Sequence, residues 1–377
     1  METLTDREEG RAALALVGVE GLGAIRFRRL VDRHGSARAV LAAAGQIRPS
    51  EHVPPGLVER LRAVRPAPTR RLRALEERGI RLVVYGGEDY PQRLTHLETP
   101  PAVLWLHGPG DLPDDRAVAV VGTRKATGYG RRMARDLGHG FGVAGWTVVS
   151  GMAAGVDGAA HRGALEAAGP TVGVLGSGLD HEYPAVHRRL YRRMRGEGLL
   201  ASEFPPEERP RPGHFPRRNR ILAALADAVV VVQAGASSGA LITTDLALEL
   251  GREVFAVPGP VGPEASVGVH QLLRDGAAPA TSARSVIEAL EGSHPADAPT
   301  GPTPSADRLA GLFGREAGSA RALCRRLLEG PRDEDELARG AGLPAGDAAA
   351  MLCRLELDGA VRRLPGGRWE LAPRPEA

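Results

Sequence analysis

Short apolar runs alternate with helical stretches from residue 117 to residue 257 of this 377-residue chain. The runs that we expect to be strands are Val118–Val121, Thr147–Ser150, Thr171–Leu175, Leu199–Ala201, Ala228–Gln233 and Glu253–Val257. The first is β-branched and lacks polar alternation, which is typical of a strand buried on both faces. Strands that alternate with helices predict an α/β domain with a doubly wound, mostly parallel sheet.

Nearly every predicted strand ends in a loop of small residues. These loops are Gly122-Thr123, residues 150–155 with Gly151 and Gly155, Gly176-Ser177-Gly178, residues 235–239 with Ser237, Ser238 and Gly239, and Pro258-Gly259. The carboxyl ends of parallel strands share one edge of a sheet, where ligands bind. Because glycine lets a ligand approach the backbone closely, five such loops predict a binding site at that edge.

The first of these loops has the features of an anion site. The stretch AVAVVGTRKATGYGR (117–131) passes from a strand through Gly122-Thr123-Arg124-Lys125 into a helical pattern from Arg131 to Phe141. Free backbone N–H groups and the positive end of the helix dipole then face one point. Arg124 and Lys125 add two cations there. A plain turn with a solvated Arg–Lys pair remains the alternative.

Two common nucleotide sites are excluded. Gly122, Gly128 and Gly130 lack the dinucleotide spacing G-x-G-x-x-G, and no acidic residue ends the next strand. No G-x-x-x-x-G-K-[ST] phosphate loop occurs in the chain. We therefore expect phosphate binding without NAD, without ATPase activity and without a cofactor. No metal-ligand spacing is present, and no nucleophile stands with a base and an orienting group.

The densest basic run of the chain surrounds one phenylalanine. Phe215 stands next to Arg217, Arg218, Asn219 and Arg220, and further arginines precede it. They are Arg188, Arg189, Arg192, Arg193, Arg195, Arg209 and Arg211. An aromatic ring among cations suits unpaired nucleic acid, since stacking contributes roughly 1–3 kcal/mol per base while arginines hold phosphates. The alternative is a solvated basic helix start with Phe215 in the core.

Asp157 and His161 are spaced to lie on one face of a helix. In an enzyme they form an acid/base pair, with Glu203 opposite. In the structural interpretation, which we favour, Asp157 starts the helix and His161 is its hydrogen-bonded neighbour.

The chain length predicts two or three domains. Residues 1–80 read as a helical, SAM-like or helix-hairpin-helix unit, and 81–291 as the sheet domain, into which Leu82–Tyr85 and Val103–Leu106 lead. A Pro/Gly/Ser-rich linker follows at 292–306. Residues 307–377 show three helices and a hairpin, a winged-helix pattern. Its third helix carries mostly acidic charges, which favours an auxiliary or protein-interaction role over reading a DNA groove.

Apolar runs and cysteines indicate where in the cell the protein is expected. No apolar run approaches the roughly 18 residues of a membrane span, and no signal peptide opens the chain. The two cysteines, Cys324 and Cys353, are far apart, which indicates a reducing cytosol. We expect a cytoplasmic protein. Its net charge of +3 alone says little about its partners.

Ordered motifs make the chain similar to a known family. VGTRKATGYG (121–130), SGMAAGVDGAAH (150–161), VLGSGLDHEYP (174–184), FPRRNRI (215–221), SSGALITTDLALELGREVFAVPG (237–259) and DGA (275–277) resemble the DNA-processing protein A family (DprA, also called Smf). The resemblance is strong over residues 80 to 290, and the terminal domains fit the family's layout.

This resemblance implies an extended Rossmann-like domain that binds single-stranded DNA, dimerises and loads RecA recombinase during natural transformation and recombination. Single-strand-binding protein is a further expected partner. Arg124 would hold a phosphate in the first loop, Phe215 with Arg217, Arg218, Asn219 and Arg220 would form the strand-binding rim, and Ser237, Ser238 and Gly239 would close the pocket. Gly122, Thr123, Lys125 and Gly151 complete the expected site, and no catalysis is expected.

The chain also departs from the family pattern. It has His270 in the G-x-N segment, Gln233 where an acidic residue is usual, and His187 where an asparagine is usual. These departures affect the shape of the pocket. The alternative function is a nucleotide-phosphoribohydrolase-like enzyme on the same sheet edge, with Asp157, His161 or Glu203 in acid/base roles. A third interpretation is a duplex-DNA regulator that acts through the winged helix.

Overall fold

The computed structural model describes residues 4–50, 52–292, 317–327, 332–357, 360–364 and 368–371. The chain forms two compact units, residues 1–290 and 291–377. Most of the predicted linker at 292–306 lies outside the described residues.

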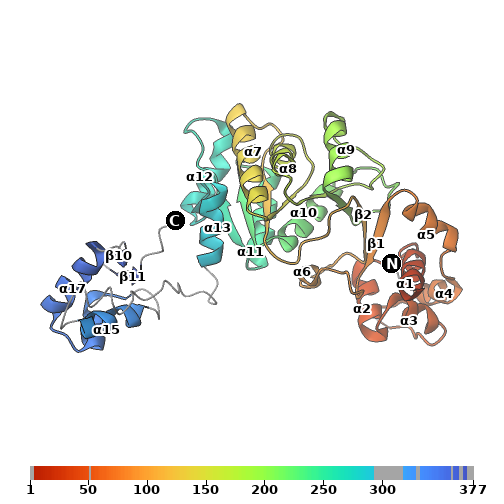
Figure 1. The fold of residues 1–377 in the computed structure, drawn as a ribbon. Helices are drawn as coiled ribbons and strands as arrows, with labels where there is room; N and C mark the ends of the chain where they lie inside the picture. Colours follow the sequence, from red (N-terminus) through yellow and green to blue (C-terminus); the bar gives the residue numbers. More distant parts are fainter. Residues whose placement is uncertain are drawn as a thin grey trace. The chain divides into compact units, whose positions relative to one another are not determined.

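A nine-stranded sheet organises the first unit (Figure 1). Its strands, in spatial order, are β1 (Ile80–Val84), β2 (Val103–His107), β6 (Leu199–Ser202), β5 (Thr171–Val174), β4 (Thr147–Ser150), β3 (Ala117–Val121), β7 (Ala228–Val231), β8 (Glu253–Ala256) and β9 (Ala278–Pro279). β1 pairs antiparallel with β2, and β2 pairs antiparallel with β6. The seven neighbouring strands from β6 to β9 in this spatial order, β6-β5-β4-β3-β7-β8-β9, are all parallel. The predicted α/β class with a mostly parallel sheet is confirmed.

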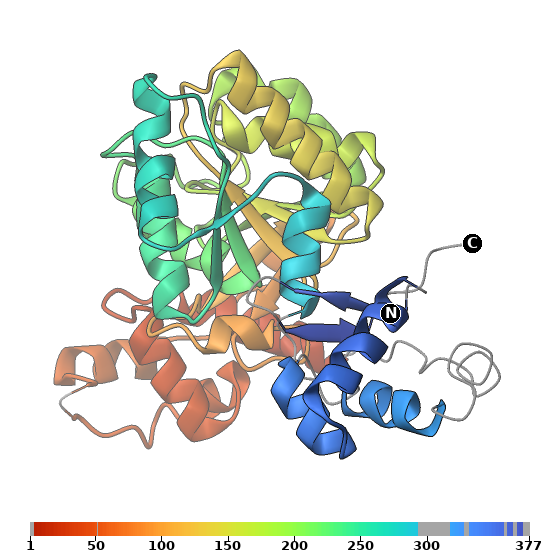
Figure 2. The ribbon, with the colours of Figure 1, turned by 90° about the vertical axis from the view of Figure 1, so that its left-hand side faces the viewer.

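Helices cover both faces of this sheet (Figure 2). Side chains alternate between the faces of a strand, and every residue of β3 is buried. Its Val118 and Val120 pack with α7 (Gly128–Val143), α8 (Val156–Glu166) and α13 (Ala283–Gly292). Its other residues share a core with α6 (Gln92–Thr95), α10 (His214–Leu225), α11 (Gly239–Glu249) and α12 (Val267–Arg274).

The N-terminal helices pack on the antiparallel end of the sheet. They are α1 (Leu4–Leu16), α2 (Ala24–His34), α3 (Ala37–Ala42), α4 (Pro55–Ala63) and α5 (Thr69–Glu76). Their core residues, such as Phe27 and Leu57, belong to the same buried cluster as Trp105 of β2 and Tyr191 of α9 (Arg188–Glu197). The first compact unit therefore runs across the predicted boundary at residue 80.

The second unit has the predicted winged-helix pattern. Its described elements are α15 (Ala317–Leu327), α16 (Glu334–Ala341), α17 (Ala345–Leu357) and the antiparallel pair β10 (Val361–Arg363) and β11 (Trp369–Leu371). Trp369 packs against the helices through Leu323 and Leu352, which share its buried cluster. Within the described residues of both units, we find no helix with the length and apolar character of a membrane span.

Candidate functional site

A cavity of ≈ 660 Å³ lies beyond the carboxyl ends of β3 and β7. These strands are neighbours, but the chain continues from β3 to β4 on the other side of the sheet. The cavity therefore occupies the point where the strand order reverses, which is where open α/β sheets bind ligands. Its described lining includes Gly122, Thr123, Arg124, Lys125, Ala153, Asp157, Tyr183, Arg211, Phe215, Arg218, Asn219, Ser238, Gly239 and Ile242.

The loop after β3 lines the cavity, and its backbone is hydrogen-bonded to the chain just after β7. Thr123 N–H donates to Gln233 O at 2.8 Å. A Cβ on Gly122 would lie 2.6 Å from Val156 Cγ2, so only glycine fits this approach. Arg124 and Lys125 are exposed, and neither forms an ion pair in the described part of the chain. The predicted pair of cations thus lies at the cavity without a carboxylate partner among the described residues.

The side chain of Gln233 forms hydrogen bonds with Thr127, the residue that precedes the first turn of α7. Its Oε1 accepts from Thr127 N at 3.0 Å, and its Nε2 donates to Thr127 Oγ1 at 3.0 Å. Thr127 in turn caps the helix by accepting from Gly130 N, so α7 begins at Gly128, earlier than the Arg131 that the sequence pattern indicated. One of the free N–H groups expected to face a ligand therefore binds within the protein.

The loop after β4 is ordered by a buried carboxylate. Asp157 accepts from Ala153 N at 3.2 Å and is only 6% exposed. Burial raises the pKa of Asp157, while the nearby Arg218 guanidinium acts in the opposite direction. Gly151 lies against both side chains, since a Cβ there would be 2.4 Å from Arg218 Nη2 and 2.6 Å from Asp157 Oδ2.

The acid/base set of the enzyme alternative does not converge. His161 is fully buried, and its Nδ1 lies 2.8 Å from Thr171 Oγ1, so the expectation that it is hydrogen-bonded to Asp157 is wrong. Burial lowers the pKa of His161 to about 3, so the ring is neutral near pH 7. Neither His161 nor Glu203 is among the described residues that line the cavity, and only Asp157 is.

One face of α10 forms a wall of the cavity. Phe215, Arg218, Asn219 and Leu222 line it, and their spacing of three, four and seven residues is that of a single helix face. Arg217 and Arg220 are not in this lining. Both donate to Glu203 Oε2 at 2.7 Å, which attaches α10 to the chain just after β6.

Arg218 is a buried arginine that supports the wall from inside. It is 4% exposed and donates through Nη1 to Gly151 O at 2.7 Å and to Val174 O. Burial lowers its pKa, and Asp157 opposes that shift. The side chain therefore ties α10 to the ends of β4 and β5 instead of reaching into solvent as a rim residue would.

The ring of Phe215 is close to both a cation and a second aromatic ring. The Arg124 guanidinium is 5.0 Å from the centroid of the Phe215 ring, and the Tyr183 ring is 5.7 Å away with an interplanar angle of 45°. These three residues also line a smaller cavity of ≈ 120 Å³, which includes Gly151 and Gly176. The half-buried Phe215 thus belongs to the site and not to the sheet core.

The loop after β7 closes the opposite side of the cavity. Ser238 caps α11 by accepting from Ala240 N at 3.4 Å, and Gly239 O accepts from Asn219 Nδ2 at 3.4 Å. Ser237, next to them, is not in the described lining. Neither is Pro258-Gly259, where Gly259 O lies 3.0 Å from His270 Nε2.

Sequence reasoning did not single out some lining residues. Tyr183 is the main one, although it lies inside the family-like stretch 174–184. The sequence feature that could have identified Tyr183 is an aromatic residue shortly after the third small-residue loop. The exposed Ile242 is another such lining residue. Arg211, which belongs to the basic run identified from the sequence and pairs with Glu208 at 3.0 Å, also lines the cavity.

Comparison with known proteins identifies the family. Residues 81–291 match the family described as DNA recombination-mediator protein A, and residues 293–367 match the DprA winged helix domain. A putative DNA processing protein DprA of Mycobacterium tuberculosis is 41% identical over 314 residues, which cover 80% of this chain and 79% of the relative. The chain belongs to this family.

Two solved structures share the fold. DNA processing protein A from Streptococcus pneumoniae aligns with a TM-score of 0.63 and 31% identity, over 74% of this chain and 96% of that one. The protein of the same name from Helicobacter pylori aligns with a TM-score of 0.52 and 29% identity, over 57% and 97%. The Helicobacter structure is described as giving insight into a unique single-stranded DNA binding mode.

Proposed function

We propose that this member of the DNA recombination-mediator protein A family binds single-stranded DNA at the cavity beyond β3 and β7, without sequence preference. The observation that carries the proposal is the exposed Arg124 guanidinium, 5.0 Å from the centroid of the Phe215 ring, with Lys125 beside it. Stacking rings next to cations are how proteins hold unpaired strands. The Helicobacter relative, whose structure concerns single-stranded DNA binding, supports the same ligand here.

Each group has a separate task in this proposal. Arg124, Lys125 and the backbone of the first loop hold phosphates, and a base packs against Phe215 or Tyr183. These contacts address the phosphate and the face of a base, which are common to all four nucleotides. Binding is therefore independent of sequence. Arg218 and Asn219 position α10, and Ser238 and Gly239 limit the cavity on the side of α11.

We extend the proposal to the partners that the family resemblance implies. The chain loads RecA recombinase onto the bound strand during natural transformation and recombination, acts as a homodimer in the cytoplasm, and meets single-strand-binding protein on the same DNA. It does so without catalysis or a cofactor. The rate of RecA filament formation on a strand coated with single-strand-binding protein, with and without this chain, tests the loading step.

The enzyme alternative has one residue in its favour, because Asp157 lies in the cavity. Glu203 is engaged by two arginines, and His161 is buried away from the site. Release of free base from nucleoside monophosphates would support this alternative. No release, together with DNA binding, would support the main proposal.

The proposal is tested by fluorescence anisotropy of labelled dT, dA and dC oligonucleotides in a salt series, with duplex DNA as competitor. Wild type should bind all three alike and resist the duplex. Arg124→Ala should weaken all three equally and lower the slope of log K against log salt by about 0.7, the value for one phosphate on a single strand.

Phe215→Ala should weaken binding with little change in that slope. Arg29→Ala, an exposed arginine of α2, is the matched control and should bind as wild type does. Equal affinity for duplex and single strand, or no effect of either site variant, would contradict the proposal.

A further inference from the structure

We propose that the bound single strand continues from the cavity over the start of α9, where Arg188, Arg189 and Arg192 hold the phosphates of the following nucleotides. This inference rests on the proposed function, because it extends the path of the same ligand. We call these three residues, with Tyr183 and Val186, the α9 track.

The α9 track begins at the cavity. Tyr183 lines both cavities, and the short 3-10 helix η1 (Ala185–His187) leads from it to α9. His187, which directly precedes Arg188, has its Nδ1 3.1 Å from Met152 O. Met152 adjoins Ala153, another residue that lines both cavities. Arg188 directly follows His187, so the start of α9 is tied to the loop that contributes Ala153 to both cavities.

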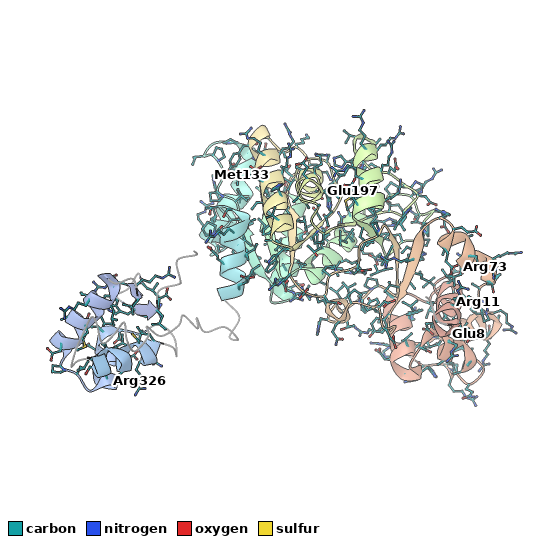
Figure 3. All side chains as sticks on the ribbon, in the orientation of Figure 1. Glu8, Arg11, Arg73, Met133, Glu197 and Arg326 are labelled. Atoms are coloured by element: carbon teal, nitrogen blue, oxygen red, sulfur yellow. The ribbon has the colours of Figure 1, made fainter. Side chains whose placement is uncertain are left out.

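Among the described residues, the cations of the α9 track have no acidic partners. In the segment from Asp180 to Glu197, each acidic residue pairs with a different arginine. Asp180 pairs with Arg78, Glu182 with Arg195 at 2.6 Å, and Glu197, labelled in Figure 3, with Arg193 at 2.6 Å. Arg188, Arg189 and Arg192 are exposed and form no ion pair in the part of the chain that the structure describes.

Stabilisation of α9 does not explain why arginines occupy its first turn. Arg188 and Arg189 lie in the first turn of α9, which contains no acidic residue. The helix dipole makes this end positive, so cations there are unfavourable and anions are favourable. A bound phosphate would offset this repulsion, because the phosphate is attracted both by the arginines and by the positive end of the helix.

The spacing of the α9 track suits an extended strand. Arg188 and Arg192 are one turn apart on one face, about 6 Å along the axis at 1.5 Å per residue. Exposed apolar groups lie between them and the cavity, since Tyr183 is 46% exposed and Val186 is 76% exposed. Apolar and aromatic surface can contact bases, and the cations beyond it can hold the phosphates of the same strand.

The test compares oligothymidylates of increasing length, from dT3 to dT30, by anisotropy in a salt series. For long strands, R188A/R189A/R192A should lower the log–log salt slope by roughly 2, which is three phosphates at 0.7 each. Between 50 and 200 mM salt, wild type should then lose about 18-fold more affinity than the variant. The shortest strand that binds should bind both proteins equally, because it fills the cavity alone.

Two further variants test whether the effect comes from lost positive charge, and whether it depends on the position of that charge. R188K/R189K/R192K should retain most of the affinity for long strands, because the track needs positive charge. R29A/R33A/R48A removes equal charge from exposed arginines of the N-terminal helical region and should bind as wild type does. Helix α2, which carries Arg29 and Arg33, lies far from α9 in Figure 1. The α9 track is refuted if R188A/R189A/R192A keeps the wild-type salt slope with long strands. It is also refuted if the slope of R29A/R33A/R48A falls by the same amount. If wild type binds no single strand, the proposed function itself fails.

Discussion

The contact of Phe215 with Gly176 shows how closely the site residues are packed. A Cβ on Gly176 would lie 2.8 Å from Phe215 Cδ1, so the chain has no room for a side chain behind the ring. The ring is therefore held on one side by the backbone after β5 and approached by Arg124 and Tyr183. A fixed ring can stack with a base without first being ordered.

Gly176→Ala should therefore move Phe215 and weaken the binding of single strands. The loss should approach the roughly 1–3 kcal/mol that one stacked base contributes. Anisotropy with oligo-dT measures it. The control is Gly45→Ala, where a new Cβ meets nothing within 4 Å. Unchanged affinity in Gly176→Ala would mean that the position of the ring does not matter for binding.

His161 makes the stability of the chain depend on pH. Its pKa is lowered from 6.5 to about 3 by burial, so below about pH 6.5 the unfolded chain takes up a proton that the folded chain does not. The free energy of unfolding should therefore fall as the pH decreases from 6.5 toward 3, by up to about 1.4 kcal/mol per pH unit from this group.

Asp157, whose pKa is raised, contributes with the opposite sign. The measurement is therefore the difference between wild type and His161→Gln in urea unfolding from pH 7 to pH 4. The difference should shrink as the pH falls, because only wild type carries the His161 contribution. A difference that is independent of pH would contradict the neutral, buried ring.

At the scale of elements, α10 has two faces with different tasks. Phe215 and Asn219 face the cavity with Arg218 beneath them, whereas Arg217 and Arg220 bind Glu203. The basic run and Phe215 were identified from the sequence, but all four of the following residues were expected at the rim. The helical period alone indicates that they divide between faces. Which face is the cavity depends on Glu203 and Val174, distant residues that no local pattern reveals.

A pair of variants separates these two faces. Glu203→Gln removes the negative charge that pairs with Arg220 of α10. Removing one partner of such a buried ion pair lowers the free energy of unfolding by about 3–5 kcal/mol. The variant should lower the midpoint of urea unfolding. Asn219→Ala removes one long hydrogen bond, worth about 0.5–1.5 kcal/mol, and should weaken DNA binding at nearly unchanged stability. The opposite pattern would contradict this division of α10.

The order of the elements was predictable, and their capping was not. Short buried strands separated by helical patterns indicated the parallel sheet, and β3 through β8 lie within a few residues of the predicted runs. The start of α7 was misplaced because Thr127 and Gln233, 106 residues apart, form its cap together. Contacts of this kind depend on the finished fold.

At the scale of the whole molecule, the cavity belongs entirely to the first compact unit. Every described residue that lines it lies between Val121 and Thr243, whereas the winged-helix pattern lies in the second unit. The sequence indicated both terminal parts. It did not show that the N-terminal helices share one core with β2 and α9, because that core joins residues far apart in the chain.

Removal of residues 306–377 should therefore leave single-strand affinity within about threefold of wild type, a difference below 1 kcal/mol. Anisotropy with oligo-dT measures it, and a melting curve checks that the first unit remains folded. Loss of all DNA binding in a folded truncation would favour the duplex-DNA regulator that acts through the winged helix.

The central claim is that a base of the bound strand packs against Phe215 or Tyr183, and photochemical cross-linking tests it most directly. An oligo-dT in which single positions carry 5-iodouracil is bound at low salt, irradiated and digested, and the modified peptides are identified by mass spectrometry. Cross-links at Phe215 or Tyr183 that disappear in Phe215→Ala/Tyr183→Ala are the predicted result. Cross-links confined to residues 4–76 or 317–371 would place the strand elsewhere and contradict the account.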